Sequence, residues 1–325
     1  MVARKVVTNV FACIAHTKKK TAFALSLFAG LALGNVAGAA TADDCDRQCL
    51  KKFADLYFVA LAAHDPAKLP VAANVKFTEN NAVLKLGEGH WKAGGKESYR
   101  MQIFDPEQGG IGIEAVIPSA SGPAVMALRL KIEHQLISEV DAVVTYKASG
   151  PIFGPEKLAG TEPAYFWTRT IRPTERNSRY ELIAATEGYW RAFETTGTPE
   201  YIRAPLLPDT LRTENGLQTT DTTMAIANVP ANLLPKGFVP PPDGRIPTGT
   251  ATEQFDGGIF KGMKIAERRY PVVDVEVGAV LSMARFGATP EGAVVAEFFA
   301  ITQGKIRQIA AVFTAPTKPS RSPWY

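Results

Sequence analysis

The sequence has few of the residues that usually reveal catalytic chemistry. It contains three cysteines and four histidines in 325 residues. It has no Gly-x-Ser-x-Gly nucleophile elbow, no phosphate-binding glycine loop, no zinc-ligand spacing and no dinucleotide fingerprint. These absences argue against serine hydrolases, nucleotide-dependent enzymes and zinc sites. We therefore expect cofactor-free acid–base chemistry or ligand binding, with neither a metal nor an organic cofactor.

The first 39 residues have the composition of a targeting segment. Lys18, Lys19 and Lys20 precede an apolar stretch at 21–33, and small residues follow at 37–39. This is the order of a secretory signal peptide, and the apolar stretch is too short to span a bilayer. We expect residues 1–39 to be removed, which makes the mature protein periplasmic or secreted and leaves it without membrane contact.

Removal of this segment would bring the net charge close to zero. Five of the 36 Lys and Arg residues, and none of the 32 Asp and Glu residues, precede residue 40. The remaining 31 basic residues against 32 acidic ones give a net charge of −1. Such a chain offers no basic face for nucleic acid or anionic lipid. We expect a small molecule or a glycan as the ligand.

Two cysteines, Cys45 and Cys49, remain after residue 39. An even number of cysteines in an exported chain suggests a disulfide. Because the two lie four residues apart at the edge of an expected helix, a bridge requires an irregular first turn. Free thiols are the alternative, and a metal site is not indicated because no further Cys or His lies nearby.

The chain after the signal contains one pattern twice. Each copy opens with an apolar stripe of helical period, at 50–61 and again at 182–193. A Thr-Glu-Asn turn follows at 78–80 and at 213–215. A hairpin of two apolar strands then closes each copy. Recurrence of these elements in the same order predicts a tandem duplication.

The repeat sets the expected domain boundaries. We place the first domain at 43–147 and the second at 178–314. Residues 148–177, which are rich in glycine and proline, have the composition of a linker. The proline-rich stretch 221–252 is an insertion in the second copy and should act as a lid or a packing arm. The tail, 315–325, is expected to be loose.

These elements resemble the nuclear transport factor 2-like, or SnoaL-like, superfamily. More narrowly, they are similar to an uncharacterised family of secreted fungal and bacterial proteins with two such domains. The resemblance implies an α+β fold of two tandem cone-shaped domains, each a curved, mainly antiparallel sheet packed on N-terminal helices. The motifs that carry it are AHDP at 63–66, VKFTEN at 75–80, RTENGLQTT at 212–220, QFDGGIF at 254–260 and RRYPVVD at 268–274.

The resemblance also implies a kind of chemistry. Superfamily members such as ketosteroid isomerase, scytalone dehydratase, polyketide cyclases and limonene epoxide hydrolase use a buried carboxylate or histidine as acid or base. Tyr, Asn or Arg side chains polarise the substrate oxygen. None of their site motifs matches this chain residue by residue, so residue type and position supply the candidates.

The second copy has the denser set of polar candidates. We predict Asp256 or Glu214 as the catalytic base. Arg212 and Arg269 would hold the ionised base and bind a substrate oxygen. A structural role is the alternative, because Arg-Glu-Asn on a turn often closes a loop through side-chain-to-backbone hydrogen bonds. The ligand-binding candidates of this copy are Asn215, Asp274 and Tyr189.

The first copy contributes a histidine. His90 and Trp91 could combine a general base with a stacking surface, although an ordinary exposed loop histidine is the favoured interpretation. Tyr57 and Tyr189 occupy equivalent helix positions, where they either pack in the core or donate to a ligand. No histidine follows residue 177, so the two copies cannot share a histidine mechanism.

Together these features predict an exported, cofactor-independent lyase or isomerase that acts on a small oxygenated metabolite or sugar. We expect its pocket in the second domain, under the insertion at 221–252. One alternative is a non-catalytic binding or assembly module. Another is a hydrolase that uses Asp256, Arg269, Asp274 and a water. The chain should be a monomeric pseudo-dimer or a homo-oligomer.

Overall fold

The computed structural model describes residues 45–229, 231, 238–319 and 321–325. The expected signal peptide lies outside the described residues, as does part of the insertion. Residues 40–325 form one compact unit, to which everything below refers. Within the described part of the chain, no helix is long and apolar enough to cross a bilayer.

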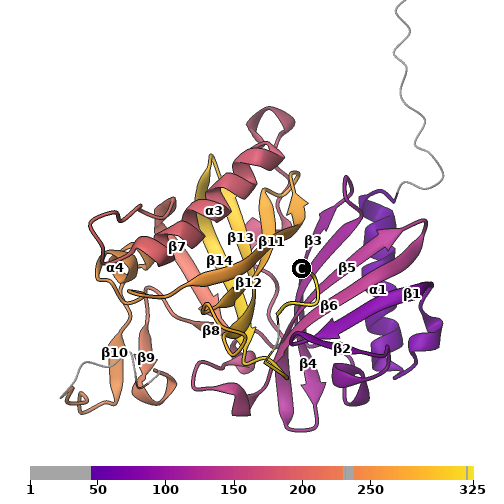
Figure 1. Ribbon diagram of the computed structural model, residues 1–325, viewed down its shortest axis with the longest axis horizontal. Coiled ribbons are helices and arrows are strands. Elements are labelled where there is room, and N and C mark those ends of the chain that lie inside the picture. The colour runs from indigo at the N-terminus through magenta and orange to yellow at the C-terminus, as the bar shows by residue number, and fades with distance from the viewer. Residues whose placement is uncertain (1–44, 230, 232–237, 320) are drawn as a thin grey trace, which may run out of the picture. The chain divides into compact units, whose positions relative to one another are not determined.

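The first half consists of one amphipathic helix and a six-stranded sheet (Figure 1). The apolar stripe predicted for the helix is buried against the sheet, which confirms the helix. Its elements are α1 (Arg47–Ala62), η1 (Pro66–Lys68), β1 (Val71–Glu79), β2 (Ala82–Leu84), η2 (Gly89–Lys92), β3 (Tyr99–Asp105), β4 (Gly110–Ser119), β5 (Gly122–Glu133) and β6 (Leu136–Thr145).

The disulfide between Cys45 and Cys49 is present, with a Cα–Cα distance of 5.2 Å. Asp46 caps α1 by accepting a hydrogen bond from the backbone N–H of Cys49 at 2.8 Å. Cys45 therefore precedes the helix, and its extended approach lets it reach the first turn. This is the irregularity that the four-residue spacing requires.

The second half repeats the plan and adds the insertion. Its elements are α3 (Arg179–Thr195), β7 (Leu206–Glu214), β8 (Leu217–Gln218), β9 (Thr223–Ala225), η6 (Ile226–Asn228), β10 (Arg245–Pro247), α4 (Ala251–Asp256), β11 (Ile265–Asp274), β12 (Ala279–Phe286), β13 (Ala293–Thr302) and β14 (Lys305–Thr314). The segment between the halves contains η3 (Lys147–Ser149), η4 (Pro155–Lys157), α2 (Tyr165–Thr168) and η5 (Pro173–Glu175).

The two sheets have the same topology. Their strand orders are β2-β1-β6-β5-β4-β3 and β8-β7-β14-β13-β12-β11. Each is antiparallel except for one pair, β1 with β6 and β7 with β14. Glu79 lies opposite Ala142 in the first parallel pair, and Glu214 lies opposite Ala311 in the second. This register is the one expected from aligning the repeats, so the fold is two tandem α+β cones.

Each sheet has an inner face, which packs on its own helix, and an outer face, which packs on the other sheet. The inner faces form one core with α1 and another with α3. The outer faces form a between-sheet core that joins the two halves. Its members include Met101, Ile103, Leu281, Met283 and Phe298.

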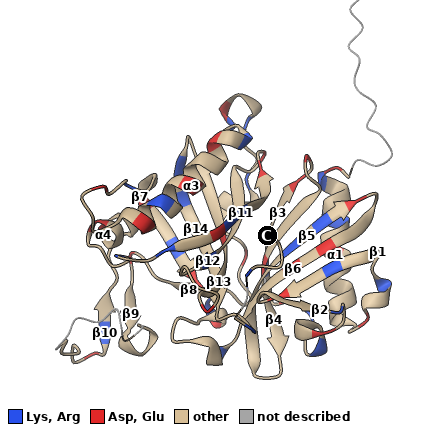
Figure 2. Cartoon of the chain, viewed as in Figure 1, with Lys and Arg blue, Asp and Glu red and all other residues tan. Residues whose placement is uncertain are grey.

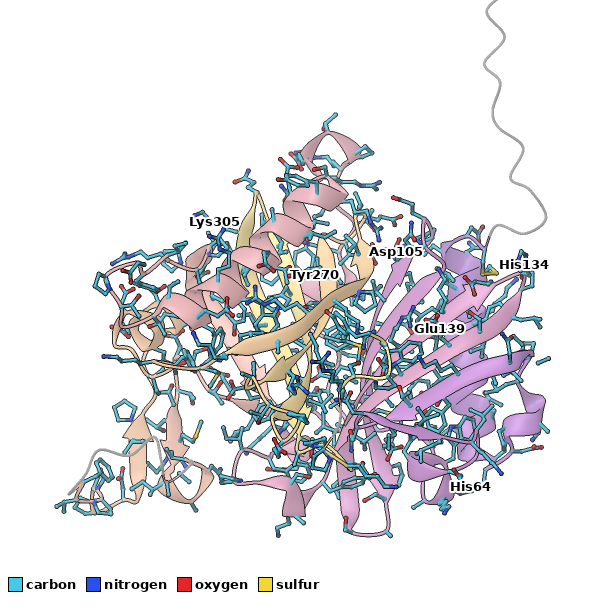
Figure 3. All side chains as sticks on the ribbon, viewed as in Figure 1. His64, Asp105, His134, Glu139, Tyr270 and Lys305 are labelled. Carbon is cyan, nitrogen blue, oxygen red and sulfur yellow. A yellow bond between two sulfur atoms is a disulfide. The ribbon has the colours of Figure 1, made fainter. Side chains whose placement is uncertain are left out.

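Two ion pairs with buried carboxylates cross between the halves in a reciprocal arrangement. Asp105, at the end of β3, accepts from the Arg179 guanidinium at 2.8 Å and from the Val273 N–H at 2.9 Å (Figure 3). Asp274, at the end of β11, accepts from Arg47 at 2.7 Å and from the Phe104 N–H at 2.9 Å. The arginines open equivalent helices and the aspartates end equivalent strands, so a pseudo-twofold axis relates the halves.

The tail is not loose where the structure describes it. Trp324 donates through Nε1 to Thr78 Oγ1 at 3.0 Å. Its ring lies beneath three cationic side chains, those of Lys76, Arg129 and Arg269, at 4.1 to 5.6 Å. The expectation of a loose tail rests on its proline content and is wrong. Burial and cation–π contacts of the Trp324 ring stabilise the tail, and proline content does not indicate such contacts.

Candidate functional site

Arg212 and Glu214 lie together inside the second cone. They are two residues apart on β7, so strand alternation places both on the inner face. The Arg212 Nε is 3.3 Å from Glu214 Oε1, and its Nη2 donates to Gln254 of α4. The guanidinium stacks on the Phe260 ring at 5.0 Å. This part of the predicted cluster is present.

The other three charged candidates lie elsewhere. Asp256, the last residue of α4, pairs with the exposed Arg203 at 2.9 Å. Arg269 contacts Asp141 of the first half at 2.5 Å, because its position on β11 faces the outer side of the sheet. Asp274 belongs to the interface ion pair with Arg47. The predicted joint site of these residues with Arg212 is therefore not formed, and the Asp-Arg-Asp hydrolase arrangement is not formed either.

Asn215 and its counterpart Asn80 are structural. Both have positive φ, 48° and 50°, which asparagine tolerates well. The Asn215 amide donates to the Phe313 carbonyl and accepts from the Phe313 N–H. Asn80 makes the same two bonds with Val144. These side chains continue the parallel pairing past the strand end, so the prediction of Asn215 as a ligand-binding residue is corrected.

The interior of the second cone is filled by its own aromatic residues. Phe255 of α4 is buried against Tyr189 and Phe193. The Thr196 hydroxyl donates to the Phe255 carbonyl and fixes the end of α4 to α3. These contacts hold α4, the helix at the end of the insertion, against α3. A cavity of about 540 Å³ does lie beside the insertion, but none of the predicted site residues lines it.

A glutamate missed by the sequence reasoning lies in that interior. Tyr189 donates through its hydroxyl to Glu297 Oε1 at 2.9 Å. Burial raises the pKa of Glu297 to about 8, and burial also raises the pKa of Tyr189. Two buried atoms here, Arg212 Nη1 and Glu297 Oε2, have no hydrogen-bond partner among the described residues. A single acidic residue within the apolar strand AVVAEFFAIT was the signal that could have revealed it.

The first cone holds a hydrogen-bonded chain of Glu79, His90 and Tyr57. His90 Nδ1 is 2.7 Å from Glu79 Oε2, and the His90 backbone N–H donates to the same oxygen at 2.7 Å. His90 Nε2 is 2.9 Å from the Tyr57 hydroxyl. Trp91 Nε1 donates to that hydroxyl at 3.1 Å. His90 and Trp91 are therefore buried members of a network rather than an exposed loop.

One assignment of protons satisfies this network. An indole nitrogen only donates, so the Tyr57 oxygen accepts from Trp91 and its own proton goes to His90 Nε2. The imidazole proton is then on Nδ1, where it donates to the ionised Glu79. In this state the histidine is neutral, and Glu79 is the end of the hydrogen-bonded series that is partly exposed. Its side chain is 10% exposed, whereas that of His90 is fully buried.

Glycine at position 89 lets the backbone approach Glu79 closely. Gly89 has a φ of 60°, and a Cβ there would lie 2.2 Å from Glu79 Oε2. The η2 turn can therefore present two N–H groups of the next residue to one carboxylate oxygen. A larger residue at this position would displace the carboxylate.

A cavity of about 560 Å³ opens beside this chain, at the mouth of the first cone. The η2 turn, the β4–β5 turn and the start of the linker surround it. Burial and the neighbouring Glu79 raise the pKa of Tyr146 in its wall to about 12, so this phenol remains protonated and can donate. The lining is mainly apolar and includes Gly89, His90, Ile117, Pro118, Tyr146 and Ala148. A pocket with few polar groups suits a small organic molecule.

Basic and acidic residues are interspersed over both halves (Figure 2). No group of three or more His, Cys, Asp or Glu side chains among the described residues is placed to hold a metal ion.

Comparison with known proteins adds little about activity. A family model described as "Domain of unknown function (DUF8021)" matches residues 175–313, which contain the second cone. Among solved structures, the chain is similar to one titled "Crystal structure of putative ketosteroid isomerase from Kribbella flavida DSM 17836", with 15% identity and a TM-score of 0.27. The match covers 38% of this chain and 96% of that chain. No curated protein matches the sequence.

Proposed function

We propose that the chain is a lyase or isomerase that moves a proton on a small oxygenated molecule bound at the mouth of the first cone. The observation that carries the proposal is the Glu79–His90–Tyr57 chain beside a cavity of about 560 Å³. The mainly apolar lining favours a metabolite with an apolar body over a sugar. We also propose, as the sequence predicts, that the mature chain is exported.

Each residue of the site has a distinct role in this proposal. We assign Glu79 as the base, because its Oε1 is not used by His90 and its side chain is partly exposed. Glu79 is not itself a lining residue of the cavity, which it adjoins through Gly89 and His90. His90 is a positioning residue, since its two N–H groups fix the carboxylate. Tyr146 is placed to donate to a substrate oxygen. Glu79 would remove a proton next to a carbonyl, and the electron pair would move onto the oxygen.

The intermediate has two possible fates. Return of the proton to a different carbon gives isomerisation. Loss of a leaving group from the neighbouring carbon gives elimination. Neither fate requires a group beyond the substrate and the residues named.

The experiment follows proton removal directly. Cyclic and aryl ketones of a size that fits the cavity are incubated with the chain in D₂O, and loss of the α-proton signal is followed by NMR. We expect exchange above the buffer rate, and a decrease of about 10²-fold or more in Glu79→Gln. Glu133→Gln, at an exposed hairpin position, is the matched control. Equal exchange rates in wild type and Glu79→Gln would remove Glu79 as the base.

The second candidate function is ligand binding without chemistry. Tyr57 is fully buried, and both ring nitrogens of His90 already have a partner. Such a network can serve only to shape the pocket wall. In that case the ketones would bind, as detected by a change in Trp fluorescence, but their α-protons would not exchange faster than in buffer.

A further inference from the structure

A second cavity, of about 670 Å³, lies between the linker and the tip of the β13–β14 hairpin. It shares no lining residue with the first-cone cavity, and none of the candidate residues discussed so far lines it. Its charged lining residues are Arg169, Arg172 and Arg176 against a single acid, Glu175. Polar neighbours are contributed by both sides and include Thr170, Thr174, Asn177, Thr302 and Gln303.

The arginines are held in place by other groups. Arg169 Nη2 donates to the Ile301 carbonyl at 3.0 Å and to Thr302 Oγ1 at 2.7 Å. Arg176 Nε donates to the Ile171 carbonyl at 2.8 Å. All three of these partner groups are neutral, so the bonds fix the guanidinium groups without neutralising them. Donors that are already positioned lose less entropy when a ligand binds.

A fourth arginine, Arg307, lies near Arg169 but outside the lining. The Phe166 ring lies between the guanidinium groups of Arg169 and Arg307, at 5.0 and 5.1 Å. Arg307 is paired with Asp209, whereas Arg169 has no acidic partner among the described residues. Burial lowers the pKa of Arg169, and so does the nearby Arg307. The buried Nε of Arg169 has no hydrogen-bond partner among the residues that the structure describes.

The lining as a whole therefore has excess positive charge. Glu175 is bound to Arg172, with Oε2 accepting from Nε at 3.0 Å. This pair is neutral, which leaves two positive charges, those of Arg169 and Arg176. A guanidinium group binds carboxylate or phosphate through two parallel hydrogen bonds. The volume exceeds that needed for one inorganic ion and is typical of a small organic ligand.

We propose that this cavity binds a small organic anion that carries two or more carboxylate or phosphate groups. Arg169 and Arg176 supply the main contacts, and the hydroxyl and amide groups of the lining supply the remaining hydrogen bonds. The 148–177 segment is then a ligand-binding element in addition to a connection between the halves.

Isothermal titration calorimetry of the full chain with citrate tests this proposal, with pyrophosphate as the phosphate probe. At low ionic strength we expect at least one of these to bind with a Kd below 1 mM, corresponding to about 4 kcal/mol. Trimethyl citrate, which has the same body without the charges, should not bind. Raising the salt concentration should weaken binding.

Matched variants locate the binding. Arg169→Gln and Arg176→Gln should each raise the Kd of the anion at least 10-fold. Arg191→Gln removes the same charge from an exposed position on α3 and should leave the affinity unchanged. Thermal unfolding of each variant separates a lost site from a lost fold, and Arg176→Gln suffices if Arg169→Gln is unfolded. The proposal is overturned if neither anion binds to the wild type, or if both variants bind as tightly as Arg191→Gln.

Discussion

Replacing Glu297 with glutamine should stabilise the chain at pH 8 and leave its stability near pH 4.5 almost unchanged. Glu297 is only 1% exposed, and burial raises its pKa from the ordinary 4.5 to about 8. Glutamine has nearly the same shape and is neutral at every pH. Its carbonyl can still accept the hydrogen bond from Tyr189.

The sign follows from where the proton is held. Between pH 4.5 and 8 the unfolded chain loses the Glu297 proton and the folded chain keeps it, so the free energy of unfolding decreases as the pH rises. The interval of about 3.5 pH units, at 1.36 kcal/mol per unit, gives a cost of about 5 kcal/mol at pH 8. Below pH 4.5 both states hold the proton, and the cost disappears.

Urea unfolding followed by tryptophan fluorescence at pH 5, 6, 7 and 8 measures this effect. The difference between Glu297→Gln and wild type should grow with pH. Glu200→Gln, which removes an exposed carboxyl of α3's C-terminal loop, should show no such growth. If Glu297→Gln and wild type have parallel pH dependence, Glu297 is not held protonated and the reasoning fails.

Two further predictions concern the first-cone site and the interface. Gly89→Ala places a Cβ 2.2 Å from the Glu79 carboxylate and should cost about 2 kcal/mol more in urea unfolding than Gly244→Ala, which has a similar φ of 64° but open space around it. Equal costs would contradict the close approach. Asp274→Asn and Asp105→Asn each break one reciprocal interface ion pair and should each cost about 3 kcal/mol. A negligible cost for either variant in the same assay would show that the pairs are not equivalent.

The sequence was sufficient to predict most of the fold, because its signals are local or repeated. The apolar stripes of α1 and α3 have helical period, and the closing hairpins alternate around turn residues. The Thr-Glu-Asn turns then fixed the alignment of the repeats, and the sheet registers of Glu79 and Glu214 agree with that alignment. None of these inferences needs a contact between distant segments.

The site was harder to predict because its contacts are long-range. Arg212 and Glu214 were correctly grouped, since residues two apart on a strand share a face. Asp274 was misplaced, because its partner is on the helix of the other half and no local pattern indicates an interface between domains. His90 and Glu79 are 11 positions apart, and they meet only because η2 folds back over the end of β1.

The reciprocal ion pairs and the between-sheet core determine how the two cones behave when the protein is diluted. Two separate cones would dissociate once their concentration fell below the dissociation constant of the interface. Joining them through 148–177 makes the association unimolecular, with an effective concentration on the order of millimolar for a short connection. The interface then stays assembled at any dilution. In a homodimer a substitution changes both subunits at once. In the fused chain a substitution changes one cone and leaves the other as it was. The two mouths are thus free to diverge, one closed by Phe255 and one open beside Glu79.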